Sequence, residues 1–103
     1  MSLRLRISDE AYAQGLQVDD WWRNNRSAAP DLFRQELADS FSILIATPYI
    51  GSLYPARHKV RRFLLKKSRY HVYYVLSEEE INILAIWHAK RGTGPALKIV
   101  ASR

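Results

Sequence analysis

Three hydrophobic runs follow one another between residues 60 and 87. The runs at 60–66, 70–76 and 81–87 are rich in aliphatic, β-branched and aromatic residues, which favour strands, and short polar breaks separate them. A parallel connection needs about a dozen residues or more, so these breaks allow only hairpins. We therefore predict an antiparallel meander of three strands.

The beginning of the chain predicts one further strand and two helices. Apolar and basic residues alternate from Leu3 to Ile7, which is typical of a strand with one buried face. Ser8 follows as a credible N-cap for a helix from about Asp9 to Asn25. The helical period then resumes in a second helix, from about Ala28 to Ala46, with Ser27 as its expected N-cap.

Each predicted helix has one hydrophobic stripe that should pack inward. On the first helix this stripe contains Ala11, Gly15, Val18 and Trp22, with Tyr12 and Leu16 beside it. On the second helix it contains Phe33, Leu37, Phe41, Leu44 and Ile45. Trp21 and Trp22 are adjacent, so one of them should lie in the core and the other on a boundary or partner surface.

Together these elements predict an α+β fold in the order β-α-α-β-β-β. Two antiparallel helices should pack on one face of a small, mainly antiparallel four-stranded sheet, and the opposite face should stay open. We expect an irregular loop between Tyr49 and His58. The length of 103 residues suits a single domain, which we place at residues 1–95, with 96–103 as a short edge strand or a mobile tail.

The alternation of strands assigns side chains to the two faces of the sheet. Arg61 and Arg62 must point to opposite faces, so only one of them can line the open face. Arg61 is the candidate for a functional role, and the alternative is a structural arginine that pairs with a carboxylate or a chain terminus. In the next strand, alternation separates Tyr70, Val72, Tyr74 and Leu76 from His71, Tyr73 and Val75.

Composition narrows the classes of function. The chain has no cysteine, which excludes disulfides and thiolate metal sites, and it has no apolar stretch of the length of a membrane span. We expect a cytoplasmic protein without a membrane partner. The three histidines have no metal-site spacing, and the sequence offers no phosphate-binding glycine loop and no Ser/His/Asp set. We therefore expect no cofactor, no metal and no conventional hydrolase activity.

Charge is distributed unevenly along the chain, whose net charge is +6. Residues 1–39 carry five Lys or Arg against seven Asp or Glu, whereas residues 40–103 carry eleven against three. No acidic residue occurs between Ser40 and Ser77. The meander should therefore present a cationic surface, which attracts phosphates, acidic membranes or acidic protein segments.

Several short motifs, spread from Ile7 to about Pro95, carry a resemblance to a known family. They are Trp21-Trp22, Asn25, Ala28-Ala29-Pro30, the P-x-x-G loop of Pro48 and Gly51, Val60-Arg61-Arg62, the run 70–74, the run 83–88 and Arg91. In this order and spacing the chain resembles the RelE/ParE superfamily of toxins from bacterial type II toxin-antitoxin systems, in its ParE-like branch. This branch includes toxins associated with plasmid stabilization.

The resemblance implies partners. A toxin of this kind is neutralised by a cognate antitoxin, whose C-terminal segment wraps the toxin and whose N-terminal domain often binds DNA. The target reported for the ParE branch is DNA gyrase, and for the RelE branch it is mRNA that is cut on the ribosome. We expect the antitoxin to place an acidic, amphipathic tail in a groove formed by the helices and the sheet.

The two branches imply different sites. An mRNA endoribonuclease would need acid-base and phosphate-binding groups, for which the candidates are Arg61, His88 and Arg91. Ala89 after His88 departs from the nuclease pattern, which favours a toxin that acts by binding a protein. The candidates for partner binding are Trp21, Trp22, Arg61, Arg69, Tyr73 and Arg91.

Overall fold

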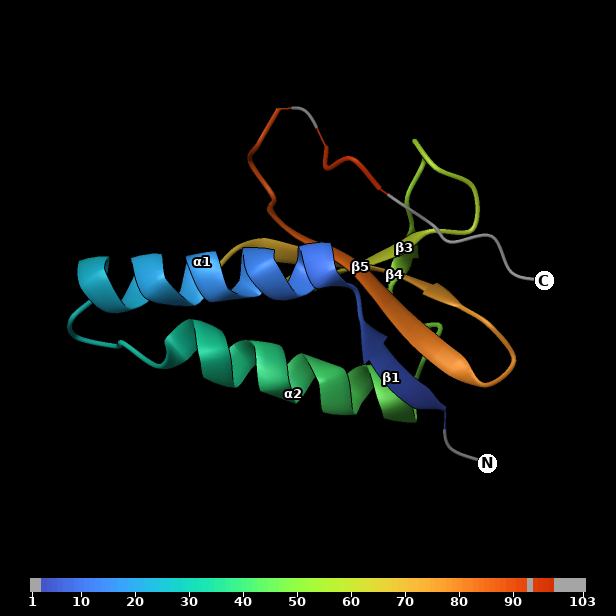
Figure 1. The fold of residues 1–103 in the computed structure, drawn as a ribbon, viewed down its shortest axis with the longest axis horizontal. Coiled ribbons are helices and arrows are strands. Elements are labelled where there is room, and N and C mark those ends of the chain that lie inside the picture. The colour runs from blue at the N-terminus through green and yellow to red at the C-terminus, as the bar shows by residue number, and fades with distance from the viewer. Residues whose placement is uncertain (1–2, 93, 98–103) are drawn as a thin grey trace.

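The computed structural model describes residues 3–92 and 94–97. Its elements, in chain order, are β1 (Arg4–Ile7), α1 (Asp9–Asn25), α2 (Leu32–Ala46), β2 (Ser52–Leu53), β3 (Arg61–Leu65), β4 (Tyr70–Leu76) and β5 (Glu80–His88). The two helices run antiparallel to each other, beside the sheet (Figure 1). The α+β class is therefore confirmed.

The five strands form one mixed sheet in the order β1-β5-β4-β3-β2. β1 runs parallel to β5, and every other neighbouring pair is antiparallel. The predicted strand count of four was wrong, because Ser52 and Leu53 pair with Arg62 and Arg61 inside the segment expected to be irregular. A strand of two residues has no alternation that a sequence pattern could reveal.

The two helices begin differently. Ser8 caps α1 as predicted, since its Oγ accepts a hydrogen bond of 3.0 Å from the backbone N of Ala11. α2 begins at Leu32, later than the predicted Ala28, and Ser27 is not its cap. The reason is local: the indole of Trp22 donates to the carbonyl of Ala29 at 2.8 Å, which holds this segment as a turn.

The main core lies between the helices and the sheet. Its fully buried members from the helices are Ala11, Phe33 and Leu44, and those from the strands include Leu65, Val72, Tyr74, Ile81 and Ile83. The alternation predicted for β4 is confirmed, because Tyr70, Val72, Tyr74 and Leu76 all belong to this core. These side chains fix the face of the sheet on which the helices pack.

A second, smaller cluster covers part of the opposite face. Val60, Tyr73, Leu84 and Ala85 are buried there, with Tyr54, Val75, Trp87 and Leu97 packed against them. Leu84 is an extra residue opposite Tyr73, so this β-bulge turns both Leu84 and Ala85 to this side. The expectation of an open face was therefore wrong for this half, which the protein covers with its own chain. The expected tail from residue 98 onward lies outside the described residues.

The hairpin between β3 and β4 is tied to α2. The carboxylate of Glu36 accepts hydrogen bonds from the backbone N of Lys67 at 2.7 Å and of Ser68 at 2.9 Å. Arg69 completes the turn with a φ of 68°. In the part of the chain that the structure describes, no helix is long and apolar enough to cross a membrane.

Candidate partner-binding groove

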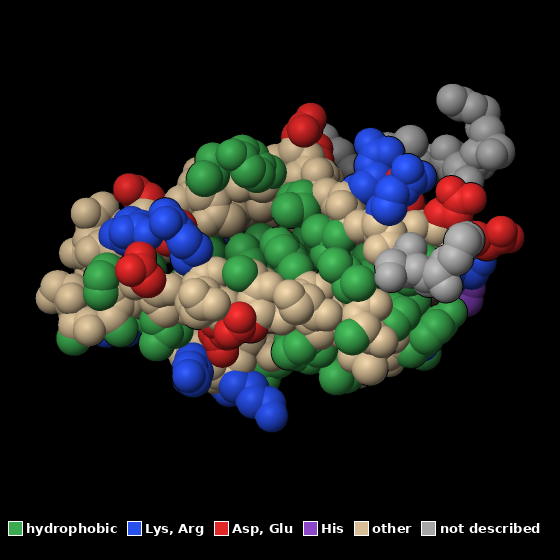
Figure 2. Space-filling model, turned by 90° about the horizontal axis from the view of Figure 1, so that it is seen from below, with side chains coloured by type: hydrophobic (Ala, Val, Ile, Leu, Met, Phe, Trp, Pro, Cys, Tyr) green, Lys and Arg blue, Asp and Glu red, His purple; other side chains and the backbone are tan. Residues whose placement is uncertain are grey.

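A groove of about 220 Å³ runs between α1 and α2 above β5. Ile86 of β5 lies beneath Gly15, while Leu16 of α1 and Phe41 of α2 are among the side chains that line the groove. Hydrophobic side chains gather in this hollow across the middle of the face shown in Figure 2, and charged side chains lie around it. The surface of the groove is almost wholly apolar.

The walls of the groove are unusually exposed for large apolar residues. The exposed fractions are 61% for Tyr12, 55% for Leu16 and 40% for Ile7. The prediction that Tyr12 and Leu16 pack inward beside the buried stripe was wrong, because they flank it and rise above the sheet on the wall of the groove. Large contiguous apolar surfaces on folded proteins are often binding sites, so this groove is the candidate site for a partner.

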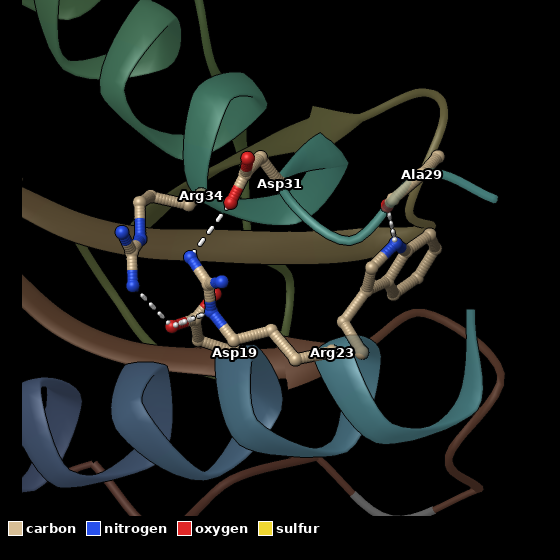
Figure 3. Close-up of polar contacts among 6 residues, drawn as sticks. Asp19, Arg23, Ala29, Asp31 and Arg34 are labelled. Carbon is tan, nitrogen blue, oxygen red and sulfur yellow. Dashed lines mark hydrogen bonds and ion pairs between the residues drawn. The ribbon is translucent and has the colours of Figure 1, made fainter. Parts of the chain in front are cut away.

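Charged residues join α1 to α2 at one end of the groove. Asp19 Oδ2 lies 3.2 Å from Arg23 Nε and 2.9 Å from Arg34 Nη2, and Arg23 also pairs with Asp31 at 2.7 Å (Figure 3). Burial alone would raise the pKa of Asp19, but the hydrogen bonds from Arg34 and Arg23 outweigh it and lower the pKa. The cluster fixes the separation of the helices and places cationic groups beside the apolar surface.

The adjacent tryptophans divide as predicted between core and surface. Trp22 is buried, with its indole bonded to the carbonyl of Ala29, whereas Trp21 is 46% exposed. The Arg26 guanidinium lies 5.6 Å from the Trp21 ring centroid, within reach of a cation–π interaction. Trp21 is thus accessible to a partner and Trp22 is not.

Arg61 occupies a structural position. Its Nη1 donates to the carbonyl of Gly51 at 2.7 Å and to that of Tyr49 at 3.2 Å, and its guanidinium lies over the Tyr49 ring. Strand parity puts Arg61 on the helix side of the sheet and Arg62 on the opposite side. The sequence made Arg61 the candidate for a functional role and left open which of the two arginines lines the far face. The structure places Arg62 on that face, because Arg62 pairs with Tyr73 and Arg61 with Tyr74.

The candidates for a nuclease are not brought together. His88 packs against Tyr70, with ring centroids 4.9 Å apart, and accepts a hydrogen bond from the backbone N of Lys90. Arg61 pairs with Tyr74 on β4, four residues from Tyr70, which is roughly 13 Å along the strand. The Arg91 guanidinium lies over Trp87 instead, 4.2 Å from its centroid. No acid-base pair with a shared phosphate site results from these positions.

The remaining candidates differ in accessibility. Tyr73 is only 3% exposed and packs edge-on against Tyr54, with ring centroids 5.0 Å apart, so its ring cannot reach a partner. Arg69 is exposed at the β3–β4 turn. Among the described residues, no group of His, Asp and Glu side chains could hold a metal ion.

Known proteins resemble this chain in sequence and in fold. A family model described as "ParE toxin of type II toxin-antitoxin system, parDE" matches residues 5–92. A solved structure, "Chromosomal ParDE TA system from P. aeruginosa", is similar with a TM-score of 0.70 and 18% identity, covering 85% of this chain and 97% of that chain. A search of curated proteins finds no match. Because the family model spans most of its length, the chain belongs to the ParE toxin family of type II toxin-antitoxin systems.

Proposed function

We propose that this protein is a toxin that acts by binding DNA gyrase, and that a cognate antitoxin neutralises it by placing an amphipathic helix in the groove between α1 and α2. The groove is the observation that carries the proposal. It holds apolar side chains in a hollow between the two helices, and nothing among the described residues covers Tyr12 and Leu16. A helix-in-groove contact buries such a surface.

The charges around the groove specify the kind of helix. Arg34 lines the groove with 63% of its side chain exposed, although it pairs with Asp19. The chain as a whole carries a net charge of +6. An antitoxin helix should therefore present apolar residues at helical spacing to Tyr12 and Leu16, and an acidic residue to Arg34.

Two observations support action by binding. The family match and the resemblance to the ParE branch point to gyrase as the target class. In addition, Arg61 is engaged by backbone carbonyls and His88 lies toward the other end of β4, so the residues that a ribonuclease of the RelE kind would need are separated. Docking on a protein surface requires no such assembly.

The test uses purified components. The full chain should inhibit supercoiling of relaxed plasmid by DNA gyrase, and an equimolar amount of the protein encoded beside it should restore supercoiling. The same preparation should leave mRNA intact in a reconstituted translation reaction. Intact supercoiling together with ribosome-dependent mRNA cleavage would contradict the proposal and favour the nuclease alternative.

A further inference from the structure

Gly15 lies in the interior of α1, although glycine is a poor residue for that place. Glycine loses more conformational freedom on folding than any other residue, and alanine is the residue that a helix interior favours most. The φ angle of Gly15 is not positive, so the backbone accepts alanine here. Neither the helix nor its backbone geometry explains this glycine.

The packing beneath α1 does not require a glycine either. A Cβ on Gly15 would lie 3.4 Å from Ile86 Cδ1 and 4.0 Å from Leu37 Cδ2, which are ordinary van der Waals distances to the ends of flexible side chains. At Gly51, by contrast, a Cβ would lie 2.5 Å from the Tyr74 phenol oxygen. The fold therefore excludes a side chain at Gly51, whereas at Gly15 it leaves the space unused.

This unused space opens into the groove between α1 and α2. Gly15 is half-buried and lines the groove, and Ile86 of β5 forms the floor below it. Gln14 holds this turn of α1 on β5, because its Oε1 accepts a hydrogen bond of 2.7 Å from the backbone N of Ile86. Leu16 of α1 and Phe41 of α2 are part of the walls. The missing side chain of Gly15 thus leaves a hole whose floor and walls are set by the fold.

The chemistry of the hole suits a single apolar side chain. Ala11, Leu37, Phe41 and Ile86 have no polar side-chain atom, so a polar group buried among them would lack a hydrogen-bond partner. The whole groove measures about 220 Å³, which is below the roughly 300–1,000 Å³ typical of small-molecule sites. Between packed helices, one side chain commonly fills a hole formed by residues of the facing helix.

We propose that the hole at Gly15 takes one large apolar side chain of the antitoxin helix, such as leucine, isoleucine, methionine or phenylalanine, and selects the antitoxin by the size of that residue. The inference rests on the proposed function, because the antitoxin helix must lie in the groove. It adds a subsite to the groove and makes Gly15, which has no side chain of its own, a residue that determines specificity.

The charged end of the groove indicates which antitoxin residue enters the hole. Asp19 follows Gly15 by one turn of α1, roughly 6 Å along the helix axis, and its Oδ2 lies 2.9 Å from Arg34 Nη2. An antitoxin helix that lies along the groove should therefore carry the residue for the hole three or four positions from the acidic residue that faces Arg34.

Two substitutions that fill the hole test the proposal, with the full chain and the antitoxin encoded beside it. Gly15→Ala should raise the Tm by about 2–8 °C, because alanine favours the helix. The same variant should weaken antitoxin binding at least about fivefold in titration calorimetry, because the added methyl overpacks the contact. Gly15→Leu should weaken binding further. Ala13→Leu adds a large side chain to the exposed face of α1, outside the groove, and should leave the affinity unchanged.

The outcomes separate the hole from the groove. If Leu16→Asp weakens antitoxin binding while Gly15→Ala and Gly15→Leu leave it unchanged, the groove is the antitoxin site and the hole is overturned. If all three variants leave the affinity unchanged, the proposed function fails and the hole fails with it. A lower Tm in Gly15→Ala would also overturn the inference, because the fold itself would then require the glycine.

A compensating change in the antitoxin tests selection by size. Each large apolar residue of the antitoxin segment that lies three or four positions from an acidic residue is replaced by alanine in turn. One of these truncations should weaken binding to the unaltered chain at least about tenfold, yet bind Gly15→Leu at least as tightly as the full-size antitoxin does. Losses that simply add in every combination would contradict a direct contact at Gly15 and overturn the proposal.

Discussion

The phenol oxygen of Tyr74 holds the loop that precedes β3. It accepts a hydrogen bond from the backbone N of Gly51 at 2.9 Å and donates one to the carbonyl of Pro48 at 2.8 Å. A Cβ on Gly51 would lie 2.5 Å from this oxygen, so only glycine fits there. Burial raises the pKa of Tyr74, although the Gly51 hydrogen bond and Arg61 partly offset it. The P-x-x-G motif is therefore a structural requirement of this core.

Removing this oxygen tests that role. Tyr74→Phe leaves the Gly51 N–H and the Pro48 carbonyl without their partner in a buried site, and should lower the free energy of unfolding by about 1–3 kcal/mol. Urea denaturation measures the change. Tyr12→Phe, at a side chain that is 61% exposed, is the matched control and should stay within about 0.5 kcal/mol. Equal stability of Tyr74→Phe and the unaltered protein would contradict this role.

His71 makes stability depend on pH. Burial, Arg62 and Arg69 lower its pKa in the folded state below the ordinary value of 6.5, so the unfolded chain binds the proton more readily. The contribution of His71 to the free energy of unfolding is therefore present above pH 6.5, the pKa of the unfolded chain. It is lost as the pH falls from 6.5 through the lower pKa of the folded state. An NMR titration should give a His71 midpoint below 6.5, and Arg62→Gln should raise it. A titration midpoint unchanged by Arg62→Gln would show that the Arg62 guanidinium lies too far from the His71 imidazole to lower its pKa.

At the scale of elements, ion pairs and core contacts set the position of α1 relative to α2. Asp19 on α1 binds Arg34 on α2, and Arg23 on α1 binds Asp31 just before α2. Trp22 adds its hydrogen bond to Ala29. The width of the groove follows from these contacts, so the groove is part of the fold of the isolated chain.

Weakening the Asp19 cluster should cost modest stability. The partners are partly exposed, so Asp19→Asn should lower the free energy of unfolding by about 0.5–1 kcal/mol, and high salt should reduce the difference. Because the pKa of Asp19 is lowered, its contribution is present above the unfolded value of 3.8 and disappears as pH falls through the folded pKa. Thermal melts at two salt concentrations measure the loss of stability in Asp19→Asn and its dependence on salt. Asp20→Asn, at an exposed position, is the control. A salt-independent loss would contradict an ionic origin.

Local patterns predicted the elements better than their edges. Strand alternation gave the faces of β4, and the Ser8 cap gave the start of α1, because both depend on neighbours in the sequence. The start of α2, the strand β2 and the bulge at Leu84 depend on contacts with distant residues, so no local pattern reveals them. The sequence predicted a groove between the helices and the sheet, but the helical pattern placed its wall residues, Tyr12 and Leu16, in the core.

At the scale of the whole molecule, the two faces have different chemistry. The helix face presents an apolar groove with paired charges, whereas the far face presents a covered hydrophobic cluster with Arg62 over Tyr54. The functional residues that sequence analysis singled out are divided among these regions. Trp21 lies on α1, Arg69 lies in the β3–β4 turn, Arg91 stacks on Trp87, and Tyr73 is buried in the cluster.

The family and the fold follow from motifs that span most of the chain, and the comparisons confirm both. The candidate site was less predictable. Whether a residue such as Arg61 binds a partner or holds a loop depends on backbone carbonyls that are distant in sequence, and only coordinates show these contacts. The uneven distribution of charge along the chain predicted that the two faces would differ, but it did not predict which residues lie on each face.

The most direct measurement of the central claim is the affinity of the antitoxin encoded beside this chain for two matched variants. Leu16→Asp puts a charge into the groove, and Leu53→Asp puts one on β2, where the side chain has a similar exposure of 62% against 55% for Leu16. Titration calorimetry should show that Leu16→Asp weakens binding at least about tenfold, because a buried leucine contributes about 1.5–3 kcal/mol. Leu53→Asp should leave the affinity unchanged. Unaltered affinity in Leu16→Asp, or an equal loss in both variants, would contradict the groove as the antitoxin site.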